Sequence, residues 1–280
     1  MNTVELPGGE SVPALGLGTW RMGESAGSRR AEVDAVHLAL EIGYRLIDTA
    51  EMYGEGGAEE VVGEALARGP VRRDEVLVVS KVYPHNAGRR GTVAACERSL
   101  KRLRTDRIDL YLLHWRGSVP LAETVAAFEH LRDAGRIRYW GVSNFDVDDL
   151  RELCDVDGGE RCAANQVYYS AGQRGIEFDL LPWQRQHRLP TMAYCPIEQG
   201  ALAASRPLQA IARARGLTAA QVALAWVLRQ PDVIAIPKAV QATHLRENLA
   251  AASIALSAAE LAQIDAAFPV PRRKRRLAMS

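Results

Sequence analysis

The sequence has 280 residues, of which 48% are hydrophobic and 25% charged, and its net charge at pH 7 is +1. These fractions are ordinary for a soluble globular protein, and the near-zero charge excludes a whole-molecule field of the kind that attracts nucleic acid. We therefore expect a small or weakly charged molecular partner and no nucleic-acid partner. Because an α/β barrel takes about 250 residues as one unit, the length predicts a single domain over residues 1–280.

Targeting and cysteine patterns point to the cell interior. The N-terminal stretch Met1–Glu10 has no basic region and no apolar run, so no secretory signal is predicted. No uninterrupted apolar run approaches the roughly 18 residues of a membrane span. Cys96, Cys154, Cys162 and Cys195 form no C-x-x-C pair, which argues against a disulfide framework and a metal site. Free thiols suit a reducing compartment, so we expect a cytoplasmic protein. No predicted helix shows an exposed apolar stripe, so we expect a monomer.

In chain order, the first predicted element is a small hairpin that turns at Leu6–Glu10. Short runs rich in strand-forming residues then recur along the chain. Most are apolar throughout, as expected for parallel strands that are covered on their outer face. The predicted strands are Leu15–Thr19, Leu46–Ala50, Val76–Lys81, Leu110–Trp115, Tyr139–Asn144, Ala164–Tyr168, Thr191–Pro196 and Val233–Lys238.

Helical patterns separate these runs. The predicted helices are Ala31–Ile42, Glu59–Ala67, Val93–Leu103, Leu121–Leu131 and Thr218–Leu228. Gly135 follows the fourth helix, where a C-cap glycine is favoured, and Thr218 is a plausible N-cap. The repeated alternation of strand and helix predicts an α/β fold, a (β/α)8 TIM barrel, although a doubly wound sheet uses the same alternation.

Polar side chains stand at the C-terminal ends of the predicted strands. Asp48, Lys81 and His114 lie there in the second, third and fourth strands. In a barrel these ends converge on one face, which is where active sites are found. Charged groups are costly to bury there, so we expect them to be paired or functional. Similar positions in later strands hold Ser143, Asn144, Gln166 and Lys238.

Tyr53 lies in the loop after the second strand, where it can return over the barrel mouth. A free tyrosine has a pKa of about 10, too high for an efficient acid near neutral pH. A nearby lysine ammonium stabilises the phenolate and lowers that pKa, and an aspartate keeps the lysine charged and in place. A neutral histidine can hydrogen-bond a carbonyl oxygen. Asp48, Tyr53, Lys81 and His114 therefore predict a catalytic site that donates a proton to an oxyanion forming on a carbonyl.

Short motifs covering nearly the whole chain share one order and spacing with a known family. They are Gly16–Trp20, Ile47–Gly54, Val79–Val82, Asp109–Trp115, Gly141–Phe145, Asn165–Val167, and Ile236–Lys238 with Glu247–Asn248. Together they resemble the aldo-keto reductase family. The resemblance implies a (β/α)8 barrel that binds NADPH or NADH in an extended pose without a Rossmann fold. It also implies hydride transfer from nicotinamide C4, with Tyr53 as general acid, Lys81 and Asp48 tuning it, and His114 orienting the carbonyl.

The resemblance further implies which residues contact the cofactor. Ser143, Asn144 and Gln166 would hold the carboxamide, and Tyr194 would stack on the nicotinamide ring. The glycine-rich Gly54–Gly57 is not a dinucleotide fingerprint, because it lacks both the G-x-G-x-x-G order and the strand-to-helix context. The implied cofactor contacts are Gly18, Thr19, Trp20, Asp48, Ser143, Asn144, Gln166, Tyr194, Pro196, Ile197, Gly200, Ile236, Pro237, Lys238, Ala239, His244, Glu247 and Asn248.

The chain departs from the family pattern at the phosphate end of the cofactor. Many members have a serine where this chain has Ala239 and an arginine where it has His244. These changes weaken the grip on a 2′-phosphate, because histidine is mostly neutral at pH 7 whereas guanidinium is always charged. Since Lys238 remains, we expect NADPH as the cofactor, with NADH as an alternative. Cys195 replaces a common serine and is interpreted as a buried small residue.

Within the family, the chain resembles short bacterial members that reduce methylglyoxal and similar small aldehydes. The segments that carry this resemblance are Asp48–Gly57, Asp179–Trp183 and Phe268–Arg273. The expected substrate contacts are Trp20, Tyr53, His114 and Trp115, with Met52 and Tyr83 as further candidate walls of a fairly open pocket. The basic run Arg272–Arg276 is interpreted as a solvated tail and not as a nucleic-acid site.

Two other functional classes fit parts of the sequence. A non-catalytic, nicotinamide-binding regulatory relative would share the fold, because fold does not fix function, but the complete set of four catalytic residues argues against it. An isomerase of phosphorylated sugars would need a carboxylate base or a metal cluster at the strand ends, and the sequence has no H-x-H or paired acidic arrangement there. The sequence therefore predicts an NADPH-dependent reductase of small aldehydes and ketones.

Overall fold

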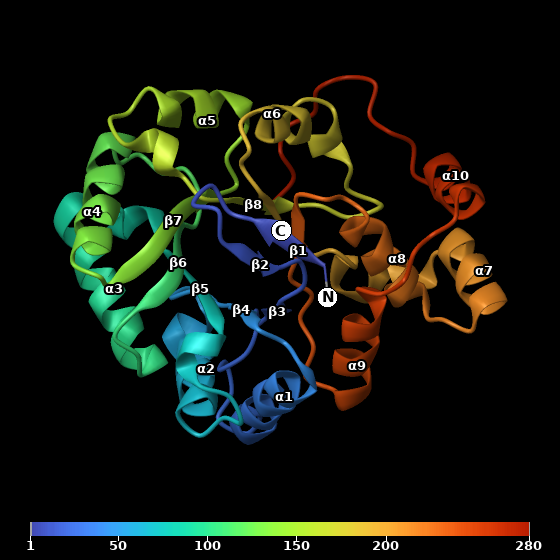
Figure 1. The fold of residues 1–280 in the computed structure, drawn as a ribbon, viewed down its shortest axis with the longest axis horizontal. Coiled ribbons are helices and arrows are strands. Elements are labelled where there is room, and N and C mark those ends of the chain that lie inside the picture. Colours follow the sequence, from blue (N-terminus) through green and yellow to red (C-terminus); the bar gives the residue numbers. More distant parts are fainter. Residues whose placement is uncertain (1, 280) are drawn as a thin grey trace.

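The computed structural model describes residues 2–279, and its centre is a sheet of eight parallel strands (Figure 1). The strands follow one another around the sheet in chain order. Bridges from Leu15 to Ala235 and from Gly18 to Lys238 join its two ends, so the sheet closes into a barrel. Closure confirms the predicted (β/α)8 fold, since a doubly wound sheet stays open. The strands are β3 Leu17–Gly18, β4 Leu46–Asp48, β5 Leu77–Val82, β6 Ile108–Leu113, β7 Ile137–Ser143, β8 Asn165–Tyr168, β9 Thr191–Tyr194 and β10 Val233–Ala235.

Helices surround the barrel (Figure 1). All five predicted helices are present, and Thr218 caps its helix as predicted by accepting a hydrogen bond from the Gln221 amide. None of the helices in the described part of the chain is long and apolar enough to cross a bilayer. The helices are α1 Arg29–Ile42, α2 Gly57–Ala67, α3 Arg89–Leu103, α4 Leu121–Asp133, α5 Val147–Cys154, α6 Leu180–Gln186, α7 Arg206–Arg215, α8 Ala219–Leu228, α9 Ala242–Ala251 and α10 Ala258–Ala267.

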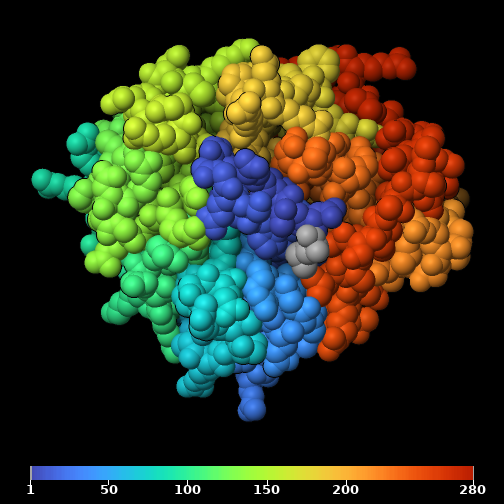
Figure 2. Space-filling view, in the orientation of Figure 1, coloured from blue at the N-terminus to red at the C-terminus, as the bar shows by residue number. Residues whose placement is uncertain are grey.

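The predicted hairpin closes one end of the barrel. Strands β1 (Thr3–Glu5) and β2 (Ser11–Pro13) pair antiparallel, and they lie over the centre of the barrel in Figures 1 and 2. Glu10 forms an ion pair with Arg138, which stands near the start of β7. The hairpin therefore covers the N-terminal ends of the strands and leaves the opposite end for a site.

Several strands are shorter than predicted at their C-terminal ends. β4 stops at Asp48, β9 at Tyr194 and β10 at Ala235, each before the end of its apolar run. By contrast, β5 and β6 are buried at every residue, because their outer faces are covered as well as their inner faces. At the shortened ends the chain leaves the sheet early, so the residues that follow turn over the barrel mouth.

The basic run Arg272–Arg276 near the C-terminus is exposed, as predicted, but one of its side chains forms ion pairs with the rest of the protein. The ammonium nitrogen of Lys274 lies 3.1 Å from a carboxylate oxygen of Asp146, 3.4 Å from one of Asp179 and 3.7 Å from one of Asp148. These carboxylates stand at the N-terminal ends of α5 and α6. The tail is thereby held against the side of the barrel.

Candidate active site

A cavity of about 680 Å³ lies at the C-terminal ends of the barrel strands. Most of the predicted site residues line it. These are Gly18, Thr19, Trp20, Asp48, Tyr53, His114, Trp115, Ser143, Asn144, Gln166, Tyr194, Pro196, Ile197, Gly200, Ile236, Pro237, Lys238, His244, Glu247 and Asn248. Two predicted residues, Lys81 and Ala239, are not part of the wall, because both are buried behind it. The strand-end residues Asp48, His114, Ser143, Asn144, Gln166 and Lys238 thus face one cavity.

Lys81 connects two of the predicted catalytic side chains. Its ammonium nitrogen lies 2.7 Å from Asp48 Oδ1, 3.1 Å from the Tyr53 hydroxyl oxygen and 2.9 Å from the Thr49 carbonyl oxygen. A lysine ammonium has three hydrogens to donate, so these acceptors account for all of them. The side chain of Lys81 is fully buried. Its position is therefore set entirely by neighbouring protein atoms.

The glycine-rich segment after β4 brings Tyr53 back over the barrel mouth. Tyr53 begins a short 3-10 turn, η1 (Tyr53–Gly56), in which Gly54 has φ +57° and Gly56 φ +93°. The segment also touches the loop after β3, since a Cβ on Gly57 would lie 2.3 Å from the Gly23 carbonyl oxygen. Glycine is needed for both the left-handed backbone and this close approach. The segment therefore positions Tyr53. Contrary to the expectation, it does lie between a strand, β4, and a helix, α2, but none of its glycines lines the cavity.

Burial has a larger effect on the pKa of the Tyr53 hydroxyl than the charge of Lys81 has. It raises the pKa of the Tyr53 hydroxyl above its usual range, against an opposing effect of the Lys81 charge. The expectation of a lowered pKa is therefore wrong in its net direction, although the effect of Lys81 has the predicted sign. Burial also opposes the charge of Lys81, but the attraction of Asp48 and Tyr53 outweighs it and raises the pKa of the ammonium. Near neutral pH the site therefore holds a charged lysine beside a protonated tyrosine.

His114 is neutral at physiological pH. Burial and the nearby Lys81 charge both lower the pKa of His114 well below its usual range. Its Nδ1 atom is buried and has no hydrogen-bond partner within residues 2–279. Because a buried N–H without an acceptor is costly, the ring proton is favoured on Nε2. The imidazole packs edge-on to the Tyr53 ring at a centroid distance of 5.7 Å. A neutral Nε2–H donor can therefore stand near the tyrosine hydroxyl.

The neutral His114 predicts acid sensitivity of the fold. In the unfolded chain His114 has the ordinary histidine pKa of about 6.5, whereas in the folded protein its pKa is lower. At a pH between these two values, the unfolded state binds a proton on His114 and the folded state does not. The free energy of unfolding should therefore fall as pH decreases below about 6.5, by up to about 1.4 kcal/mol per pH unit from this group. Urea unfolding between pH 5 and 7 measures the slope. His114→Gln should flatten it, whereas replacing the exposed His130 should not; an unchanged slope in His114→Gln would contradict the assignment.

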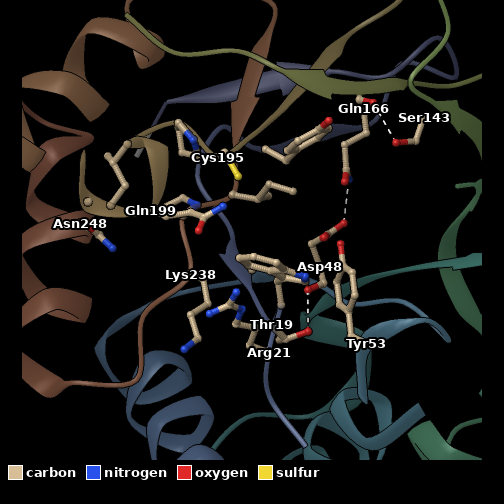
Figure 3. Close-up of a pocket in the computed structure, with 18 of the residues that line it drawn as sticks. Thr19, Arg21, Asp48, Tyr53, Ser143, Gln166, Cys195, Gln199, Lys238 and Asn248 are labelled. Carbon is tan, nitrogen blue, oxygen red and sulfur yellow. Dashed lines mark hydrogen bonds between the residues drawn. The ribbon is translucent and has the colours of Figure 1, made fainter. Parts of the chain in front are cut away.

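The side chains predicted for the nicotinamide end are already connected to the catalytic residues. The side-chain amide of Gln166 donates to Asp48 Oδ2 at 2.8 Å, and the Ser143 hydroxyl donates to the main-chain carbonyl oxygen of Gln166 at 2.9 Å (Figure 3). Tyr194 donates to Asn144 Oδ1 at 2.9 Å. Asp48 therefore uses one oxygen for Lys81 and the other for Gln166. This network orders the polar wall on the Asp48 side of the cavity.

Basic side chains line another part of the cavity. Lys238 and Arg21 both face it (Figure 3), and within residues 2–279 neither has a carboxylate within ion-pair distance. The Arg21 guanidinium lies over the Trp20 ring, 4.5 Å from its centroid. His244 and Glu247 line the cavity as well. Cations that lack a protein anion suit a phosphate group, so the wall fits the phosphates of a nicotinamide dinucleotide.

Sequence patterns missed several wall residues. Arg21, Gln199 and Met279 line the cavity, although a basic loop residue, a loop amide and a C-terminal methionine carry no local signal for this. Cys195 also lines it and is only half-buried, so its interpretation as a buried residue is wrong. Tyr83 is not a wall residue and instead packs edge-on against Trp115, with a centroid distance of 6.0 Å. Trp115 and Met52 line the cavity as expected.

Comparisons with known proteins agree on one family. The sequence model of the aldo/keto reductase family matches residues 14–268. Methylglyoxal reductase YeaE of Escherichia coli is 51% identical, over 99% of this chain and 98% of the relative. Glyoxal reductase of Bacillus subtilis is 36% identical, over 95% of this chain and 92% of the relative. The crystal structure of an aldo-keto reductase from Klebsiella pneumoniae in complex with NADPH is 53% identical, with a TM-score of 0.96 over 100% of this chain and 99% of that one.

Proposed function

The chain belongs to the aldo/keto reductase family, and from that premise we propose that it reduces small aldehydes and ketones, methylglyoxal-like compounds among them, with Tyr53 as the general acid. The protein is an oxidoreductase, and its cofactor is NADPH. One observation carries the proposal: the buried Lys81 ammonium contacts both the Asp48 carboxylate and the Tyr53 hydroxyl beside the cavity. This is the arrangement that proton donation to a carbonyl oxygen needs.

The cavity wall offers groups for the nicotinamide and for the phosphates of the cofactor. Ser143, Asn144 and Gln166 would hold the carboxamide, Tyr194 would pack against the nicotinamide ring, and Lys238 would hold phosphate. When bound, NADPH supplies a hydride to the substrate carbonyl carbon. Asn144 is held by its hydrogen bond with Tyr194, so these two groups are oriented before a ligand arrives. Such preorganisation lowers the entropic cost of binding.

The proposed proton path is short. A substrate carbonyl oxygen would accept hydrogen bonds from the Tyr53 hydroxyl and from His114 Nε2. As negative charge develops on that oxygen, Tyr53 transfers its proton to it, and the Lys81 ammonium, 3.1 Å away, stabilises the phenolate left behind. Asp48 holds the ammonium in place at 2.7 Å. His114 serves as a neutral donor that orients the carbonyl.

The expected substrates are small and largely uncharged. Trp20, Met52 and Trp115 give the cavity apolar and aromatic surfaces, which favour compact, uncharged carbonyl compounds over charged ones. Relatives that act on methylglyoxal and glyoxal support the same class. NADPH oxidation should therefore be observed with methylglyoxal and with simple aromatic aldehydes.

A steady-state panel tests the activity. Purified protein is mixed with NADPH or NADH and a series of aldehydes and ketones, and cofactor oxidation is followed by absorbance. We expect turnover with small aldehydes and a preference for NADPH. Cofactor binding without oxidation across the panel would contradict the proposal and indicate the regulatory class instead.

The cofactor preference depends on the basic wall residues. Arg21→Ala and Lys238→Ala should each raise the KM for NADPH about tenfold and leave kcat nearly unchanged, because each loses a charge-assisted contact that forms on binding. His244→Arg should increase the preference for NADPH over NADH, since a guanidinium binds a 2′-phosphate bidentately, which an imidazole cannot do. Arg213→Ala, an exposed site on α7, is the matched control. Unchanged KM values in both alanine variants would refute the phosphate role.

We also propose that residues 1–280 form one domain that acts as a cytoplasmic monomer. Cys96, Cys154 and Cys162 are free thiols in the structure, which supports a reducing compartment. Sedimentation equilibrium would test the monomer, and a dimer of fixed mass at micromolar concentration would contradict it.

A further inference from the structure

A buried carboxylate lies behind the strand that carries Lys81. Glu59, in the first turn of α2, is fully buried, and its oxygens accept hydrogen bonds from the Ser80 hydroxyl at 2.5 Å and from Arg102 Nε at 2.6 Å. Ser80 precedes Lys81 in β5, so its side chain points to the opposite face of the strand. Arg102 belongs to α3. Glu59 therefore joins α2, β5 and α3 at a point outside the barrel.

The same carboxylate lies close to the Tyr53 turn in the chain. Helix α2 begins directly after η1 (Tyr53–Gly56), so Glu59 is only a few residues from the turn. Arg102 contacts the turn directly, because a Cβ on Gly56 would lie 2.5 Å from Arg102 Nε. Movement of Arg102 or Glu59 would therefore shift the turn that carries the tyrosine.

No ligand in the cavity can reach Glu59 or Ser80. Glu59 and Ser80 are fully buried and neither lines the cavity, so they cannot contact substrate or cofactor. A buried carboxylate is costly unless it is paired and hydrogen-bonded, and here both oxygens have partners. Removing a partner should therefore change the position of α2 relative to β5, and with it the Tyr53 turn, while the other residues of the cavity wall stay in place.

We propose that Glu59, Ser80 and Arg102 form a positioning network that fixes the distance between the Tyr53 hydroxyl and the Lys81 ammonium. The turn with Tyr53 is attached to α2, and Lys81 is attached to β5, so the Glu59–Ser80 hydrogen bond sets their relative position. This inference rests on the proposed role of Tyr53 as the acid. Because proton transfer depends steeply on geometry, small displacements lower the rate of the chemical step.

The test measures kcat, KM and NADPH affinity in two variants of the full-length enzyme. Ser80→Ala and Glu59→Gln should each lower kcat for methylglyoxal reduction about tenfold, since a misplacement of about 1 Å can cost up to a hundredfold. The KM for substrate and the NADPH dissociation constant should stay within about twofold, because Tyr53 is the only wall residue that the network is proposed to position. If Glu59→Gln does not fold, Ser80→Ala, which keeps the buried carboxylate and its arginine partner, decides the question.

A double-mutant cycle separates positioning from general destabilisation. In a Tyr53→Phe background there is no hydroxyl to position, so Ser80→Ala should lower the residual single-turnover rate no further. Thr124→Val, which removes the buried hydrogen bond from Thr124 to the Ala87 carbonyl oxygen, is the control and should leave kcat unchanged. The positioning network would be overturned if Ser80→Ala lowered the rate equally with and without Tyr53, or if Thr124→Val lowered kcat to a similar extent. It would also be overturned if Ser80→Ala kept full kcat while Tyr53→Phe was inactive. Full activity in Tyr53→Phe would overturn the proposed function itself.

Discussion

Tyr53→Phe should lower kcat for carbonyl reduction about a thousandfold, within the range by which general acids accelerate such reactions. The reason is that the variant has no proton to transfer to the developing oxyanion, and the other donor, His114, only orients the carbonyl. Lys81 keeps two of its three acceptors, on Asp48 and Thr49, so the fold should lose little stability. Single-turnover rates and fluorescence titration with NADPH measure the two effects separately.

Tyr83→Phe is the matched control for this substitution. The Tyr83 hydroxyl donates to Glu55 at 3.2 Å, and the residue lies outside the cavity wall. Glu55 lies in the Tyr53 turn, but this hydrogen bond is exposed, and the Gly57–Gly23 contact and the Glu59–Ser80 hydrogen bond that hold the turn remain, so kcat should change less than about twofold. If Tyr53→Phe kept wild-type turnover while binding NADPH normally, another group would have to be the acid.

Lys81→Met should both inactivate the enzyme and destabilise it by about 3–5 kcal/mol, because it leaves the Asp48 carboxylate buried without its cation. Burial raises the pKa of Asp48, and Lys81 opposes that rise in the native protein. In the variant, the folded state should therefore bind a proton on Asp48 more readily than the unfolded state does. Such a group stabilises the fold at low pH and loses that effect as pH rises, so the destabilisation should be larger at pH 8 than at pH 5.

Two further variants check this interpretation by urea unfolding. Adding Asp48→Asn to Lys81→Met should recover part of the lost stability but none of the activity, since the buried charge is removed and the phenolate still lacks a cation. Arg29→Met, which breaks half-exposed ion pairs with Glu60 and Glu64, should cost less than about 1 kcal/mol. A loss in Lys81→Met as small as in Arg29→Met would show that the buried pair is not an ion pair.

The sequence by itself determined the alternation of parallel strands with helices and the side of the sheet that carries the site, and the family resemblance favoured the barrel over the doubly wound sheet. Asp48, Lys81 and His114 follow or end apolar strands, and parallel strands have their C-terminal ends on one face whatever the details of packing. Local rules also located the Thr218 cap and the N-terminal hairpin. The strand ends were less well predicted, as at Val233–Ala235, because an apolar run does not show where the chain leaves the sheet.

The tertiary structure alone decided how the site is assembled and charged. The close approach of Gly57 to Gly23 brings Tyr53 to Lys81, and Arg21 and Met279 reach one cavity from opposite ends of the chain. Burial is a property of the packed molecule, so it reversed the expected direction of the Tyr53 pKa shift. These features depend on contacts between segments distant in sequence, and hydrophobic periodicity records only which face of each segment is buried, not which segment it meets.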